Sequence, residues 1–444
     1  MNDWKPWAAA VWIVAATLWF FTRDLPNEAG TRAAAAFNML LLPEEIVYLD
    51  EELPMSFGGA FHPWRWKAWG TAALVWLAGY GLGGSVMALL RPAGLTVPEH
   101  VAVRFGVGLS LLSTLMLLFG LTGFLDRLPL NATLWACAAG AFVRPLLTQA
   151  ARTRLRDLPG RIAATARSHP SDLWTALVAM APFALLIAFA STVPTIEFDA
   201  RAYHLQAPKE WFEAGKIERL PHNVYTQMPA GTEMLTLLGM QLCGDWRVGA
   251  LAGQATLAGF LPLAALAAGC VARRLFGKST GPLAAAIFLT SPWALRLAAH
   301  PYAEGTLCAF GTLAVLAVTI TLRGSRRDPL RPALLAGLFA GAAFACKYPA
   351  LLLIAVPAGV AIAVAAWNAR RFSATAKLGI PFAFALGFLL LASPWLLKNL
   401  LETGNPVYPL AWGLFGGDSW DAAVNERWDA AHSPPEWSPS RWPH

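Results

Sequence analysis

Long apolar runs separated by short polar connections recur along almost the whole chain. Most of the runs approach the roughly 17–25 residues that an α-helix needs to cross a bilayer. A backbone in hydrocarbon must satisfy its own hydrogen bonds, so the runs predict spanning helices. We expect about eleven spans, at residues 7–22, 68–90, 101–124, 130–147, 173–193, 248–271, 281–298, 302–322, 332–346, 349–367 and 379–397. The pattern therefore predicts an all-α polytopic membrane protein.

Composition supports this fold class. Of the 444 residues, 56% are hydrophobic and 14% are charged, whereas a soluble domain has about 25% charged residues. The net charge of +7 would suggest a nucleic-acid partner in a soluble protein. Here the basic residues gather in a few connections between spans, which is typical of a membrane protein. We therefore expect membrane lipids and no nucleic acid as partners.

The basic connections also predict the topology. Four of them are strongly basic and would face the cytoplasm under the positive-inside rule: Arg144 to Arg167, Arg273 to Lys278, Arg323 to Arg331 and Arg370 to Lys377. The spans between them then alternate without contradiction. The N-terminus is predicted to be cytoplasmic, and residues 194–247 and 398–444 to lie on the opposite face. The acidic loop 23–67 falls on that opposite face as well.

The long loop 194–247 begins with the stretch TIEFDARAYHLQAPKEW. After its Asp, apolar and small residues recur at helical spacing, which predicts an interfacial amphipathic helix anchored by Trp211. Pro208 would kink or divide this helix, and Gly215 would end it. A second short amphipathic helix is expected around Glu233 to Leu242. The fold class thus includes an outer-face loop that carries interfacial helices.

Asp199 stands where the preceding apolar run ends. The simplest explanation is a helix N-cap, because Asp is favoured there and a helix is predicted to begin at once. A carboxylate at a membrane boundary is also a candidate functional group. Both interpretations are open at this level.

Three motifs together resemble the membrane-embedded GT-C-type glycosyltransferases, in particular the aminoarabinose transferases and protein O-mannosyltransferases. They are FDARAYHL followed by EAGKIERLP, then GLFAGAAFACKYPALLLIAVP, then LASPWLLKNLLETGNPVYPL. The resemblance extends over roughly residues 173–418 and implies a seven-span catalytic module. The expected organisation is a four-span extension at 1–172, this module at 173–418, and a polar, Trp-rich tail at 419–444.

The resemblance implies two acidic site residues. Asp199 matches the general base, and Glu304 stands where a second acid from the next outer loop is expected. Glu304 is also explained as a residue of a solvated turn or of a helix N-terminus. A divalent ion, Mg or Mn, held by Asp199 and Glu304 would fit such a site. Ala200, where the relatives often have an adjacent second acid, leaves metal dependence open.

The resemblance also implies groups that bind the donor. Lys347 and Lys398 are candidate phosphate ligands, since Gln227 replaces the Lys that precedes Pro in the relatives; snorkelling at an interface is the alternative for both lysines. Arg201 would pair with the base or reach the phosphate. Tyr203 and His204 are candidates for contact with the sugar or phosphate.

These features favour an inverting glycosyltransferase that uses a polyprenyl-phosphate sugar on the non-cytoplasmic face of a membrane. We expect the bacterial inner (plasma) membrane. The acceptor, which is a lipid, a glycan or a protein, does not follow from the sequence. A transporter or flippase of lipid-linked glycan, or an inactive scaffold of the same fold, is the alternative. Transporters usually have repeated halves, and we find no clear repeat.

Overall fold

The computed structural model describes residues 5–24, 30–34, 63–125, 127–147, 157, 160, 170–323, 328–369 and 372–433. Every named element in this part of the chain is a helix, which confirms the predicted all-α class. The acidic stretch 44–52, most of the Arg144–Arg167 connection and the end of the tail lie outside these residues.

Six helical segments of the described chain are long and apolar enough to cross a membrane. They are α3 (Pro63–Leu90), α4 (Val97–Leu121), α11 with α12 (Trp246–Ala258 and Phe260–Phe276), α15 (Glu304–Arg323), η5 with α17 (Leu351–Ala355 and Val356–Asn368) and α18 (Ala374–Thr403). The protein is thus an integral membrane protein by length and composition of its helices.

The remaining predicted runs also form helices. They are α1 (Lys5–Thr22), α5 (Arg127–Leu147), α8 (Pro170–Ala190), α13 (Thr280–Leu289), α14 (Pro292–Ala298) and α16 (Leu330–Cys346). The expected span 281–298 is divided, because α13 ends at Leu289 and Pro292 begins a new helix in place of continuing the old one. Helices therefore occur at all the predicted positions, while the number of spans above six stays a prediction.

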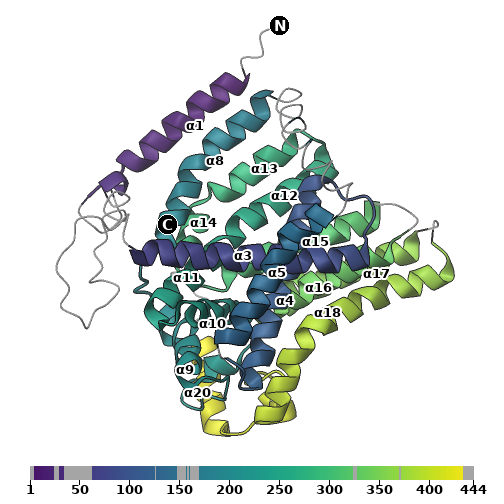
Figure 1. Cartoon of the computed structure of the whole chain (residues 1–444). Coiled ribbons are helices and arrows are strands. Elements are labelled where there is room, and N and C mark those ends of the chain that lie inside the picture. Colours follow the sequence, from purple (N-terminus) through teal and green to yellow (C-terminus); the bar gives the residue numbers. More distant parts are fainter. Residues whose placement is uncertain are drawn as a thin grey trace, which may run out of the picture.

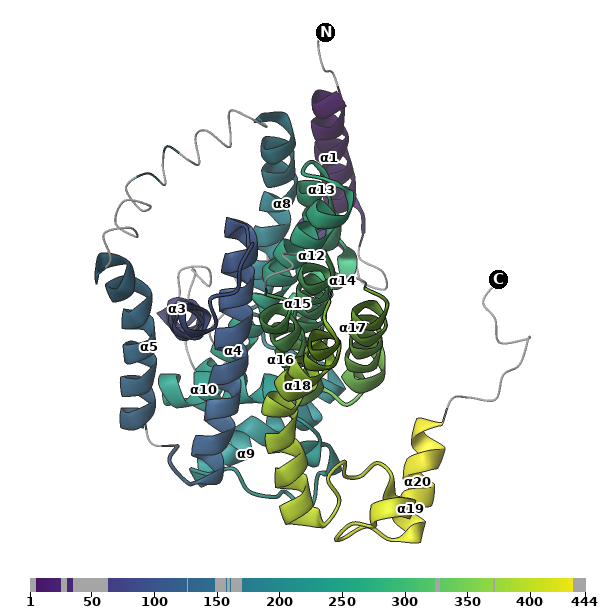
Figure 2. The ribbon, with the colours of Figure 1, turned by 90° about the vertical axis from the view of Figure 1, so that its right-hand side faces the viewer.

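The first long helices cross steeply. In Figure 1 α3 lies across the molecule, and in Figure 2 it is seen end-on while α4 and α5 stand upright. The backbones touch where they cross, since a Cβ added at Gly83 would lie 1.9 Å from the Arg104 carbonyl oxygen. Glycine is needed here for close approach. This contact joins the N-terminal helices to a core that they share with α10 (Gly231–Cys243), α15 and α16.

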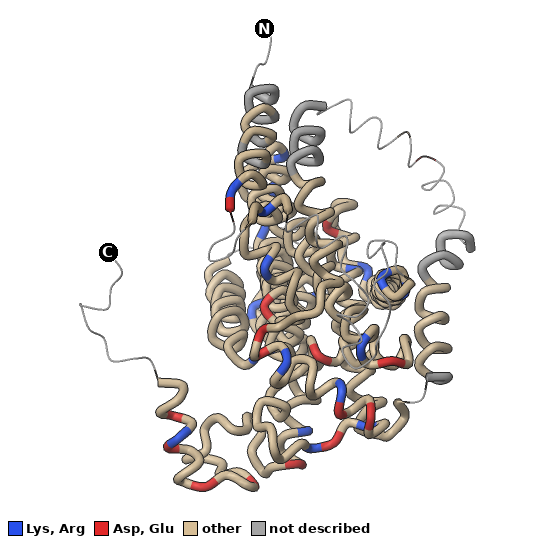
Figure 3. The backbone as a smooth tube through the Cα atoms, turned by 90° about the vertical axis from the view of Figure 1, so that its left-hand side faces the viewer, with Lys and Arg blue, Asp and Glu red and all other residues tan. Residues whose placement is uncertain are grey.

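Connections that share a predicted face gather at the same end of the molecule. Arg331 donates to the Arg91 carbonyl oxygen at 3.4 Å, and Arg323 donates to the Arg274 carbonyl oxygen at 3.3 Å. At the other end, Arg219 donates to the carbonyl oxygens of Glu402 and Asp418 at 3.2 and 2.7 Å. Figure 3 shows many charged residues at this second end, around α20 (Ala422–His432).

The loop 194–247 differs from the interfacial loop that we expected. It forms η3 (Ala200–His204), α9 (Gln206–Ala214), η4 (Val224–Gln227) and α10. Gly215 ends α9 with φ 68°, as predicted. Trp211 is not an interfacial anchor: it is fully buried, and its indole donates to the Glu218 carbonyl oxygen at 2.9 Å. The second helix, α10, is buried on nearly all faces rather than amphipathic.

Candidate active site

A cavity of about 500 Å³ is lined by residues of η3, η4 and α20. Figure 1 shows α9 and α20 at the same end of the molecule. The walls of the cavity come from segments far apart in the sequence: η3, η4, the start of α10, the turn after α16, and α20. Asp199, Tyr203, His204, Glu233 and Lys347 line it, together with Tyr225, Tyr348, Trp428 and His432. Four of the residues predicted from the sequence thus meet at one cavity.

Asp199 sits at the N-terminal edge of η3 but does not cap it. Its backbone is already helical, and its side chain makes no capping hydrogen bond. The residue is exposed at the cavity. Two large apolar residues come shortly before Asp199 in the sequence: Ile196 is 86% exposed and Phe198 is 80% exposed. The carboxylate is therefore free for chemistry beside apolar side chains that suit a lipid environment.

Lys347 and Glu304 form an ion pair of 2.6 Å between Nζ and Oε1. Lys347 follows the last residue of α16 and lines the cavity, and Glu304 is the first residue of α15. The ammonium group thus engages Oε1 of Glu304, while Oε2 has no hydrogen-bond partner among the described residues. Within the described residues, no group of three or more His, Cys, Asp or Glu side chains is arranged to hold a metal ion. A divalent ion at this site stays a prediction.

The π-helical turn η3 turns Tyr203 and His204 toward the cavity. His204 is buried, and its Nδ1 is hydrogen-bonded to Oε1 of the buried Glu233 on α10. Burial, followed by the negative charge of Asp199, raises the pKa of the Tyr203 phenol. Tyr203 therefore remains a neutral hydrogen-bonding group at physiological pH.

Helix α20 contributes aromatic rings to the same cavity. Tyr203 stacks on Tyr225 with 4.8 Å between ring centroids, and Tyr225 lies 5.6 Å from Trp428. Trp428 stacks on His432 at 3.7 Å, and the His432 Nε2 lies 3.2 Å from the Tyr225 hydroxyl. Figure 2 shows α20 standing beside the main body rather than inside it. These rings form an aromatic wall over one side of the cavity.

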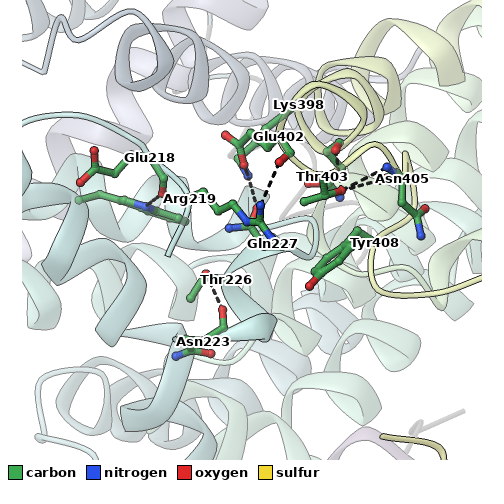
Figure 4. A network of polar contacts seen from close by, with 12 residues as sticks. Glu218, Arg219, Asn223, Thr226, Gln227, Lys398, Glu402, Thr403, Asn405 and Tyr408 are labelled. Carbon is green, nitrogen blue, oxygen red and sulfur yellow. Dashed lines mark hydrogen bonds and ion pairs between the residues drawn. The ribbon is translucent and has the colours of Figure 1, made fainter. Parts of the chain in front are cut away.

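Lys398 and Arg201 do not line the cavity. Lys398 is buried, and its ammonium donates to Gln227 at 3.1 Å and Glu402 at 2.7 Å. Figure 4 shows this network where α18 meets the segment that contains η4. Arg201 is exposed. Substrate binding by these two residues stays a prediction that the geometry does not favour.

Sequence reasoning missed several lining residues, foremost Glu233, Tyr225 and Trp428. Glu233 was predicted to lie in a short amphipathic helix and was given no role at the site, although a carboxylate within an otherwise apolar stretch is a signal of function. The aromatic residues carry no motif that distinguishes them from interfacial anchors. Their grouping arises only because η4 and α20 meet in space.

The fold and the cavity define an integral membrane protein with a polar, partly aromatic site at one end of a helical bundle. Residues 228–397 match the model of the dolichyl-phosphate-mannose-protein mannosyltransferase family, which is a GT-C-type glycosyltransferase family. The matched segment runs from the cavity wall at Met228 to the residue before Lys398, and includes Glu233, Glu304 and Lys347. Neither the curated proteins nor the solved structures gave a match. The match indicates glycosyltransferase activity in general, with a lipid-linked sugar as donor.

Proposed function

We propose that this protein is an inverting glycosyltransferase that moves a sugar from a polyprenyl-phosphate donor to the hydroxyl of an acceptor. The observation that supports this most is that Asp199 and Lys347 line the same cavity, and that the Asp199 carboxylate is not used in a helix-capping hydrogen bond. A glycosyl transfer of this kind needs a base for the acceptor and a cation for the leaving phosphate. The exposed Ile196 and Phe198 beside Asp199 suit a donor that arrives from the lipid.

In the proposed reaction, the Asp199 carboxylate takes the proton of the acceptor hydroxyl. The acceptor oxygen forms a bond to the anomeric carbon as the bond from that carbon to the phosphate oxygen breaks. The polyprenyl phosphate leaves with both electrons of that bond, and Lys347 stabilises its negative charge. Attack opposite to the leaving group inverts the anomeric configuration. No step in this scheme requires a metal ion.

We also propose that the cavity faces the outer side of a bacterial inner membrane, with the N-terminus in the cytoplasm. The positive-inside rule supports this orientation, since the strongly basic connections lie on the predicted face opposite the cavity. Cysteine accessibility tests it: Lys209→Cys on α9, in a background without the native cysteines, should react with an impermeant reagent from the outer side. Labelling from the cytoplasmic side alone would contradict the orientation.

The activity is tested with purified protein in lipid and radiolabelled polyprenyl-phosphate sugars. Wild-type protein should transfer label, and Asp199→Asn should lose about 10²-fold or more of the rate, as expected for a general base. Glu213→Gln is the matched control, because Glu213 is a half-exposed carboxylate on α9 outside the cavity. Transfer that survives in Asp199→Asn would reject Asp199 as base. Movement of lipid-linked glycan across vesicles without transfer would support a flippase instead.

A further inference from the structure

Glu233 has a feature that the proposed reaction does not use. It is 6% exposed, its Oε1 is bonded to the His204 Nδ1, and its Oε2 is buried with no hydrogen-bond partner among the residues that the structure describes. Burying a carboxylate is expensive unless it is fully bonded. A carboxylate that serves only the packing of α10 would not be expected to keep one oxygen unpaired. The free-energy cost of burying this carboxylate indicates a functional role for Glu233 at the cavity, which Glu233 and His204 both line.

The hydrogen bond between Glu233 and His204 influences which nitrogen of the His204 ring carries the proton. When Glu233 is ionised its carboxylate only accepts hydrogen bonds, and the Nδ1 of His204 then donates the proton in this contact. In the neutral imidazole, Nε2 then has a lone pair and acts as an acceptor. No bond of Nε2 is found among the residues that the structure describes. The opposite edge of the ring is thus left to accept a hydrogen bond in the cavity.

We propose that Glu233 is a positioning residue that fixes His204 as the acceptor of a hydrogen bond from a hydroxyl group of the transferred sugar. Two groups of the donor could contact His204, its phosphate and a hydroxyl of its sugar, and they differ in whether they donate or accept hydrogen bonds. The ester phosphate of the donor offers charged oxygens that accept hydrogen bonds, which suits the Lys347 ammonium and not an imidazole lone pair. A sugar hydroxyl offers a hydrogen to donate. This inference rests on the proposed glycosyltransferase function and assigns the recognition of its sugar.

The alternative is a buried histidine that only satisfies a buried glutamate. It would predict that both residues matter for stability and that neither affects the sugar. Their positions argue against it, because His204 shares the cavity with Asp199 and stands directly after Tyr203 on the same turn. A ring that is bonded at Nδ1 and lines the cavity is arranged to meet a ligand.

The experiment compares Glu233→Ala, Glu233→Gln, His204→Ala and the double variant Glu233→Ala/His204→Ala. Two quantities are measured: transfer kinetics with the polyprenyl-phosphate sugar that the wild type uses, and binding of polyprenyl phosphate without sugar. Gln241→Ala is the control, because Gln241 is a buried polar residue of α10 outside the cavity. Thermal denaturation and elution in detergent check that each variant folds.

We expect Glu233→Ala and His204→Ala each to lower kcat/KM by about 10- to 100-fold, the effect of losing a buried hydrogen bond. The double variant should be no worse than either single variant, since the two residues act as one unit. Glu233→Gln should retain most activity, because its amide oxygen still accepts from Nδ1. Binding of polyprenyl phosphate should be unchanged in all of them.

Three results would overturn the inference while the proposed function stands. They are wild-type kinetics in Glu233→Ala, additive losses in the double variant, and weaker binding of polyprenyl phosphate in His204→Ala, which would move His204 to the phosphate. A wild-type protein that transfers no sugar would instead reject the proposed function, and the sugar contact with it. If Glu233→Ala does not fold, folded His204→Ala keeps the test valid, because wild-type kinetics in that variant would also overturn the inference.

Discussion

Replacing Lys347 by Gln removes the only lysine that lines the described cavity wall. Its ammonium has three donors, of which Glu304 takes one at 2.6 Å. Two donors therefore remain for a phosphate group. The substitution keeps most of the side-chain length and removes the charge, so it tests the proposed phosphate contact directly.

The structure separates the expected effect on binding from the effect on stability. The Lys347 and Glu304 side chains are 37% and 40% exposed, and a pair of this kind contributes only about 0–1 kcal/mol to folding. A hydrogen bond from a charged group to phosphate is worth about 1.5–3 kcal/mol. Since each 1.4 kcal/mol is about tenfold in affinity, Lys347→Gln should weaken binding of polyprenyl phosphate by about 10- to 100-fold.

The assay is equilibrium binding of polyprenyl phosphate to purified protein in lipid nanodiscs. Lys216→Gln is the matched control, because Lys216 forms an ion pair of 2.7 Å with Glu218 and both side chains are exposed outside the cavity. The control should bind like the wild type. Equal affinity of Lys347→Gln and wild type would refute the phosphate contact and favour a lysine that only snorkels at the interface.

Three further predictions follow from buried or aromatic contacts. Lys398→Met should destabilise the protein by about 1.5–3 kcal/mol, because it removes the hydrogen bonds of the buried ammonium to Gln227 and to Glu402, whose side chain is 20% exposed; thermal denaturation would show this, and recovery in Lys398→Met/Glu402→Met would confirm the pair. Trp428→Ala should raise the KM for the sugar donor up to about tenfold with little change in melting temperature, and an unchanged KM would contradict a sugar contact by α20. His300 lies between α14 and α15, with its Nδ1 2.8 Å from the Thr195 hydroxyl oxygen, and burial lowers its pKa. The unfolded chain therefore binds a proton first, so melting temperature should fall as pH drops below about 6.5 and do so less in His300→Gln; parallel pH profiles would contradict this.

The sequence predicted the helices well because their cause is local. An apolar run that must satisfy its own backbone hydrogen bonds in lipid forms a helix wherever it lies. For the same reason Gly215 was recognised as the end of α9, since a left-handed residue is favoured there by its own chemistry. The division at Pro292 was missed because hydropathy does not register a proline that begins a new helix.

Part of the candidate site was also predictable. Asp199, Tyr203 and His204 lie within one turn of each other, so a motif in the sequence brings them together. Lys347 belongs to a second motif, and the structure brings it to the same cavity. Periodicity failed at Trp211, because an apolar face that suits a lipid surface suits a protein core equally well.

The amino-acid sequence by itself determined that this is a helical membrane protein, where its helices run, and which loop carries the carboxylate. Only the tertiary structure decided that Glu233 holds His204, that Lys347 faces the cavity while Lys398 is buried in a network, and that α20 supplies an aromatic wall. The physical reason is how far apart in the sequence the interacting residues lie. Helix formation depends on neighbouring residues, whereas these contacts join segments distant in the chain that only packing brings together.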